Sequence, residues 1–156
     1  MLLTDMRHAL DLPKRNAQRN LHTVRAAGGR VETAEHEWGT DVTPLVSSLG
    51  AAGGGGVDFV IACEVVYQPE SYPFLVKSIT DLSGPKTRVL LAVRRRHGTE
   101  VDAFLDLMRA GGFVLDRQEG WVGGLGAASL VGVSVTRVKE EPDFFICKMG
   151  KGTGKR

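Results

Sequence analysis

The apolar run at residues 57–63 is the feature that most constrains the fold. It reads Val-Asp-Phe-Val-Ile-Ala-Cys, so β-branched and aromatic side chains dominate it and Asp58 is its one charged residue. Near-continuous apolar runs of this length are typical of central parallel strands that are covered on both faces. Short strand-like runs alternate with longer helix-like ones on either side of it. The sequence therefore predicts an α/β domain with a largely parallel sheet.

The remaining elements follow from apolar spacing and from turn residues. One domain is expected over residues 1–149, with a glycine linker at 53–56 and a disordered tail at 150–156. Thr43 is expected to cap the second helix, because Pro44 then occupies the first helical position, where its missing N–H costs nothing. The predicted helices are 7–21, 44–49, 71–82 and 100–110, and the other predicted strands are 2–4, part of 30–38, 88–93, 113–118, 130–138 and 144–149.

Composition excludes several classes of protein. The chain has 156 residues, 42% hydrophobic and 24% charged, which is ordinary for a soluble globular domain. The net charge of +2 is too small to indicate a dedicated nucleic-acid binder. We expect no transmembrane segment and no signal peptide, because no apolar stretch is long enough and the N-terminus carries charges. Two cysteines far apart in sequence indicate buried, reduced thiols and a cytoplasmic, possibly nuclear, location.

Three patterns resemble binding sites without matching their requirements. The glycine run at 53–56 precedes a strand, whereas a phosphate loop follows a strand and opens a helix. The C-terminal glycine- and lysine-rich stretch has Arg156 where Ser or Thr should bind magnesium. The arginines at 94–96 are too few to infer RNA binding, and no His and Cys spacing matches a metal site.

Asp5 is the first candidate for chemistry, because it lies between a short strand and a helix. In doubly wound nucleotide-binding folds, an acidic residue at the end of the second strand accepts hydrogen bonds from ribose hydroxyls. An aspartate at such a junction is also a common helix cap. Both interpretations of Asp5 stay open on position alone.

Glu64 and Tyr67 directly follow the apolar run, and they form the second candidate site. Ligands of open parallel sheets bind outside the carboxyl ends of the strands. A carboxylate attracts an ammonium group and a tyrosine face holds it by cation–π attraction, so the pair suits a lysine side chain. The alternative is a glutamate that caps the next helix and a tyrosine half-buried under a loop.

Trp38 is the third candidate, within the stretch Glu35-His36-Glu37-Trp38-Gly39. A tryptophan at the end of a strand can stack on an adenine ring. Large aromatic side chains more often pack in cores or hinges, and packing is the interpretation that the residues alone favour.

Taken in order, these residues resemble the seven-β-strand protein-lysine methyltransferases of family 16, the methyltransferase-like 21 type. That family has a strand ending in Thr-Asp, an Asn-containing helix, a Trp-Gly element, a strand ending in Asp-x-x-Tyr and a later strand with Arg near its end. The resemblance covers roughly residues 1 to 120. The matching residues are Leu3-Thr4-Asp5, Asn16 and Asn20, Glu37-Trp38-Gly39, 58–67 and 90–94.

The resemblance implies a Rossmann-like seven-strand methyltransferase sheet and S-adenosyl-L-methionine as the cofactor. Asp5 would bind the cofactor ribose, Trp38 would line the adenine pocket and Cys63 would contact the cofactor through its backbone. Glu64 and Tyr67 would hold and orient the substrate lysine. The family usually has Asp where this sequence has Glu64, an extra methylene that keeps the charge and moves the carboxylate.

The resemblance also implies that the first strand and its Gly-x-Gly loop are missing, since the chain starts at the family's second strand. The strands at 2–4 and 57–63 would then face a gap with unpaired backbone groups, and a chain truncated at its N-terminus should be poorly stable or depend on another segment.

The function implied is protein-lysine N-methylation by in-line attack of a neutral amine. The family's substrates are chaperones, translation elongation factors and ATPases, and a monomer is expected. The alternatives are a non-catalytic protein-interaction module derived from a methyltransferase, and a small-molecule or nucleic-acid methyltransferase on the same fold.

Overall fold

The structure is a computed structural model that describes residues 1–50, 57–94, 100–118 and 143–150. The predicted linker at 53–56, the arginines at 95 and 96, the predicted strand at 130–138 and nearly all of the predicted tail at 150–156 lie outside these residues.

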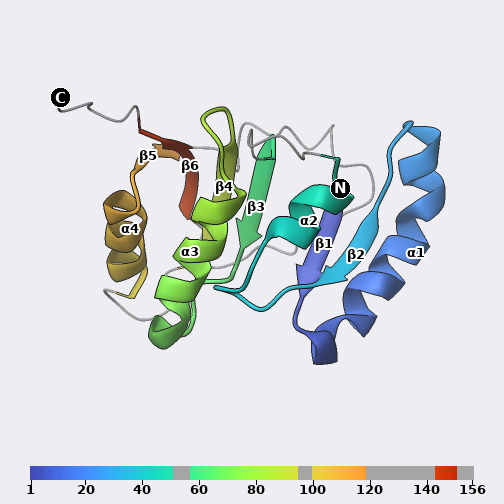
Figure 1. Ribbon diagram of the computed structural model, residues 1–156, viewed down its shortest axis with the longest axis horizontal. Coiled ribbons are helices and arrows are strands. Elements are labelled where there is room, and N and C mark those ends of the chain that lie inside the picture. The colour runs from blue at the N-terminus through green and yellow to red at the C-terminus, as the bar shows by residue number, and fades with distance from the viewer. Residues whose placement is uncertain (51–56, 95–99, 119–142, 151–156) are drawn as a thin grey trace.

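The described strands form two sheets (Figure 1). The first pairs β1 (Leu2–Asp5) with β2 (Glu32–Glu35) in parallel. The second has the order β3-β4-β6-β5, built from β3 (Phe59–Cys63), β4 (Arg88–Val93), β6 (Asp143–Met149) and β5 (Phe113–Gln118). β3 and β4 are parallel, and β6 runs antiparallel between β4 and β5. The predicted α/β class is confirmed, but the four-stranded sheet is mixed, because β6 pairs antiparallel with both β4 and β5.

The helices connect these strands on a chain path close to the predicted one. They are η1 (Arg7–Ala9), α1 (Asp11–Ala26), α2 (Thr43–Ser48), η2 (Pro69–Ser71), α3 (Tyr72–Leu82) and α4 (Glu100–Ala110). β4, β5 and α4 have the predicted bounds. α1 begins later than predicted and continues to Ala26, and it tolerates Pro13 because that residue lies in its first turn.

The predicted cap of α2 is wrong. Thr43 is already the first residue of the helix and Val42 occupies the N-cap position without a side-chain bond. Asp41 does the capping instead: its Oδ1 accepts hydrogen bonds from the backbone N–H of Thr43 at 2.9 Å and from the Thr43 hydroxyl at 2.7 Å. These two bonds lower the pKa of Asp41 and satisfy a free N–H at the start of the helix.

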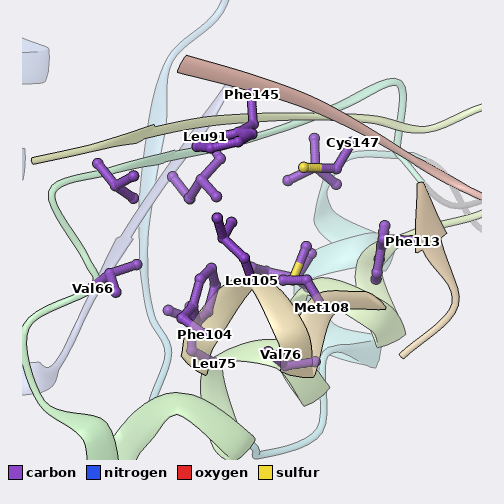
Figure 2. Packing of buried hydrophobic residues seen from close by; sticks show 14 of the residues in the cluster. Val66, Leu75, Val76, Leu91, Phe104, Leu105, Met108, Phe113, Phe145 and Cys147 are labelled. Atoms are coloured by element: carbon purple, nitrogen blue, oxygen red, sulfur yellow. The ribbon is translucent and has the colours of Figure 1, made fainter. Parts of the chain in front are cut away.

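One hydrophobic core holds the four-stranded sheet against α3 and α4 (Figure 2). Phe104, Leu105 and Met108 of α4 face Leu91 of β4 and the β6 side chains in that view. The edge of Phe104 meets the Tyr72 ring, with 5.5 Å between ring centroids. Each fully buried large side chain of this kind contributes about 1.5–3 kcal/mol. The core therefore anchors all four strands of this sheet and fixes the positions of the C-terminal ends of β3 and β4.

Cys147 lies inside this core, fully buried, as predicted for a reduced intracellular thiol. Burial raises its pKa to about 12, so it is a neutral packing group at physiological pH. Cys63 is also a free thiol, as predicted, but it is exposed at the end of β3, whereas burial was predicted.

β3 is not covered on both faces as predicted. Phe59 and Ile61 are 55% and 61% exposed, while Val60 and Ala62 face the core side. The core packs against α3 and α4 on one face of the sheet, and because side chains alternate along a strand, Phe59 and Ile61 point to the opposite face. Among the described residues β3 pairs only with β4 and β1 only with β2, so no ladder joins the two sheets there.

No helix in the described part of the chain is long and apolar enough to cross a bilayer.

Candidate functional site

A cleft of about 520 Å³ lies between the two sheets, and it extends from the carboxyl end of β1 along the middle of β3 and along α3 to its last residue. Its size is within the usual range for sites that bind small molecules. β1, the loop after β2, β3, the loop after β3 and one side of α3 all contribute to it. The described residues that line it are Thr4, Asp5, Met6, His36, Glu37, Trp38, Val60, Ile61, Ala62, Val65, Tyr67, Gln68, Ser71, Phe74, Leu75, Ser78, Ile79 and Leu82.

Asp5 reaches the cleft from the end of β1. Its Oδ1 accepts a hydrogen bond from the backbone N–H of Met6 at 2.8 Å, and its backbone carbonyl accepts one from His36 N–H at 2.9 Å. The first bond fixes the orientation of the carboxylate and leaves it further lone pairs. The cap interpretation is not what the structure has, because the N-cap residue of η1 is Met6 and that of α1 is Leu10, neither with a side-chain cap bond.

Trp38 and Tyr67 meet across the cleft although they come from different loops of the chain. Their ring centroids are 6.3 Å apart and the ring planes are inclined by 58°. Trp38 is half-buried and its inner part packs against the hydrophobic core, whereas Tyr67 is 50% exposed. The packing interpretation of Trp38 is correct, and the same side chain also lines the cleft.

Glu64 has left-handed backbone geometry, with φ of +55°. Its N–H donates to the carbonyl of Ala92 at 2.9 Å, so the ladder between β3 and β4 continues one residue into the loop. Non-glycine residues in this region are uncommon, and they concentrate at functional sites. The bend at Glu64 turns the chain sharply after β3 and directs the following loop, with Tyr67, over the cleft.

Of the five residues that the sequence singled out, the structure brings Asp5, Trp38 and Tyr67 to the cleft lining. Cys63 and Glu64 are not among the described residues that line it, although they directly follow its wall in β3. Although Cys63 is exposed, partial desolvation of its thiol raises the pKa, and the Glu64 charge raises it further, so the thiol stays protonated.

His36 and Ser78 are lining residues that sequence reasoning missed as partners. His36 Nε2 lies 2.9 Å from Ser78 Oγ, and the same hydroxyl oxygen accepts the Gly39 N–H at 2.8 Å. Burial lowers the pKa of His36, which keeps the imidazole neutral. The two residues are 42 positions apart in the sequence, and the one available signal was that His36 lies just before Trp38.

The charge of the lining is one-sided. Asp5 and Glu37 contribute carboxylates, and no lysine or arginine is among the described residues around the cleft. A phosphate would find no cation there, whereas a cationic ligand is favoured. Among the described residues no group of three His, Cys, Asp or Glu side chains is arranged to hold a metal ion.

The sequence matches the profile of a family described as Lysine methyltransferase over residues 1–110. The chain belongs to this lysine methyltransferase family. The resemblance drawn from Thr4-Asp5, Trp38-Gly39 and the strand before Tyr67 is thereby confirmed.

Named relatives agree with the family at modest identity. EEF1A lysine methyltransferase 3 of Xenopus tropicalis is 28% identical over 99 residues, 62% of this chain and 39% of that protein. The same-named protein of Mus musculus is 30% identical over 102 residues, 63% of this chain and 38% of its own. Protein N-lysine methyltransferase METTL21A of Danio rerio is 29% identical over 107 residues, which are 69% of this chain and 44% of that protein. The chain thus spans about two-fifths of the length of these relatives.

Solved structures confirm the fold. A methyltransferase from Pyrococcus furiosus superimposes with a TM-score of 0.58 at 13% identity, over 96% of this chain and 62% of that one. A TehB-like S-adenosylmethionine-dependent methyltransferase from Corynebacterium glutamicum superimposes with a TM-score of 0.57 at 14% identity, over 96% of this chain and 67% of that one. At these identities the likeness concerns the fold, and it confirms the predicted Rossmann-like methyltransferase architecture.

Proposed function

We propose that this chain carries the ribose-, adenine- and lysine-facing part of an S-adenosylmethionine-dependent protein-lysine N-methyltransferase. The observation that carries the proposal is the cleft between the sheets, where Asp5, Trp38 and Tyr67 converge from three separate segments. Family membership supports the reaction class.

The cleft fits the cofactor in size and in chemistry. A volume of about 520 Å³ accommodates a nucleoside with an amino-acid arm. The Asp5 carboxylate would accept hydrogen bonds from the ribose hydroxyls, the Trp38 ring would lie against the adenine and the backbone at Cys63 would complete the contact. The acidic lining suits a cationic sulfonium, because opposite charge stabilises it at close range. When bound, S-adenosylmethionine supplies an electrophilic methyl group.

Tyr67 and Glu64 would handle the lysine. The Tyr67 ring is half-exposed at the cleft and tilted against Trp38, so its free face is available to an ammonium group. The Glu64 carboxylate would attract the lysine and help it to lose the proton that blocks nucleophilic attack. Alignment by these two side chains and exclusion of water are the main sources of rate enhancement that the chain offers.

The substrate class is protein. Because two relatives are named as EEF1A lysine methyltransferases, we propose elongation factor EEF1A as the first substrate to test, ahead of chaperones and ATPases. We also propose a monomer and a cytoplasmic or nuclear location, consistent with two cysteines that are both free thiols.

Transfer of tritium from methyl-labelled S-adenosylmethionine to purified EEF1A tests the proposal. We expect incorporation into lysine, lost in Tyr67→Ala and reduced about a hundredfold or more in Glu64→Gln, the scale of a lost general acid–base group. Glu70→Gln is the matched control, because Glu70 is exposed on η2 and is not among the lining residues. Cofactor binding without transfer to any protein would instead favour the non-catalytic module.

A further inference from the structure

The end of β2 is tied to α3 through one buried histidine. His36 is 8% exposed and directly follows β2, and Ser78 is 2% exposed in the middle of α3. Their side chains are 2.9 Å apart, and Ser78 also accepts the N–H of Gly39. On its other side, His36 Nδ1 lies 3.4 Å from the hydroxyl of Thr40. Both partners of the histidine thus connect to the turn that carries Trp38.

The donors and acceptors of these hydrogen bonds fit one arrangement of protons. The Thr40 hydroxyl donates its single proton to the carbonyl of Glu37 at 2.7 Å, so it faces His36 as an acceptor. Nδ1 of His36 therefore carries the ring proton, and Nε2 is bare. The bare Nε2 accepts from the Ser78 hydroxyl, whose oxygen accepts from Gly39 N–H. The order requires a neutral imidazole, in agreement with the direction of its pKa shift.

We propose that His36 is a positioning residue that holds Trp38 at the cofactor cleft through Ser78 and Thr40. The turn 37–40 receives two anchors from this one ring, the Gly39 backbone through Ser78 and the Glu37 carbonyl through Thr40. Trp38 lies between these anchors, so its ring position depends on both. This inference rests on the proposed function in so far as it names the ligand that Trp38 faces.

The position of His36 predicts a selective kinetic effect. The His36 network lies on the Trp38 side of the cleft, whereas Glu64 and Tyr67 come from the loop after β3. Loss of the histidine should weaken cofactor binding more than protein-substrate binding, because Trp38 faces the cofactor directly and reaches the lysine side only through its ring contact with Tyr67. A residue with only a structural role would lower stability and activity without such a split between the two substrates.

The test compares His36→Leu with His36→Gln in a Trp121→Phe background, so that Trp38 is the sole fluorophore of its type. Glutamine can supply one acceptor and one donor, and leucine neither. We expect His36→Leu to raise the Kd for S-adenosylhomocysteine and the KM for the cofactor about three- to tenfold, the effect of one net hydrogen bond. The KM for EEF1A should rise less than the KM for the cofactor, and His36→Gln should recover most of the lost cofactor binding. Equal loss of cofactor binding in His36→Leu and His36→Gln would overturn the proposal, as would an equal rise in the KM values for the cofactor and for EEF1A.

A second measurement needs neither ligand nor variant. Nitrogen NMR of labelled wild-type chain reports which ring nitrogen of His36 is protonated, and we expect the neutral form with the proton on Nδ1. A proton on Nε2, or a doubly protonated ring at neutral pH, would refute the order described above. Absence of S-adenosylhomocysteine binding to folded wild-type chain would count against the proposed function, and the tautomer would then decide the positioning role separately.

Discussion

Replacing Gly39 by alanine tests how closely the turn after Trp38 packs on α3. Gly39 has φ of +86°, and an alanine there is strained by about 1 kcal/mol. Its Cβ would lie 2.8 Å from Cδ1 and 3.2 Å from Cβ of Phe74. The ring of Phe74 is 56% exposed and can swing away, but its Cβ is fixed by α3, so overlap adds about 1–2 kcal/mol. We expect Gly39→Ala to lower the free energy of unfolding by about 2–3 kcal/mol in total.

Urea denaturation at equilibrium measures this loss from the shift of the midpoint at constant slope. Gly28→Ala is the matched control. Gly28 has φ of +73° and an added methyl group would meet nothing within 4 Å, so this substitution should cost only the strain of about 1 kcal/mol. Adding Phe74→Gly, which removes the Cβ that the new methyl group meets, to Gly39→Ala should show a favourable coupling of about 1–2 kcal/mol. If Gly39→Ala costs no more than Gly28→Ala, or if the coupling is zero, the close contact between this turn and α3 is refuted.

Three further predictions concern other parts of the chain. Glu64→Asp should keep methyl transfer and raise stability by a few tenths of a kcal/mol, because aspartate tolerates the left-handed φ of +55° better than glutamate; a destabilised Glu64→Asp chain would contradict this. Burial lowers the pKa of His36 in the folded chain, so below pH 6.5 the unfolded chain binds a proton there that the folded chain does not. The free energy of unfolding should therefore fall as the pH drops from 6.5 through the lower pKa of the folded state. Urea denaturation repeated across this pH range checks the effect, and an unchanged slope in His36→Gln would refute it. Hydrogen exchange should be slowest in β4 and fast in α1, which buries no residue, and equal protection of the two would disprove the ranking.

Elements with a strong local pattern were predictable from the sequence. The apolar face of α4 at Val101, Phe104 and Met108 repeats at helical spacing, and Gly112 ends the helix region with φ of +90°. β4 is likewise a short, mainly apolar run, and β5 begins directly after the two glycines that end α4. For such segments local preference and tertiary packing agree, and predicted and observed bounds coincide.

Pairing between distant segments was not predictable in the same way. The burial of β3 depends on which elements cover each face of the sheet, and Phe59 and Ile61 are exposed because the core with α3 and α4 packs on the face that Val60 and Ala62 share. The cap of α2 depended on the residue at which the helix begins: because it begins at Thr43, the side chain of Asp41 and not that of Thr43 accepts the hydrogen bond from a free N–H. At the site, the sequence supplied Asp5, Trp38 and Tyr67 separately. The ring contact and the bond from His36 to Ser78 exist only once the loops after β2 and β3 and helix α3 are brought together.

Calorimetric titration of the chain with S-adenosylhomocysteine tests the central claim most directly, since it asks whether the cleft between the two sheets holds the cofactor. We predict saturable binding with a Kd between about 10 μM and 1 mM, weakened at least about tenfold by Asp5→Ala and by Trp38→Ala and unaffected by Asp11→Ala on the exposed start of α1. Absence of heat with a folded sample, or binding that survives both substitutions, would contradict the assignment of this cleft.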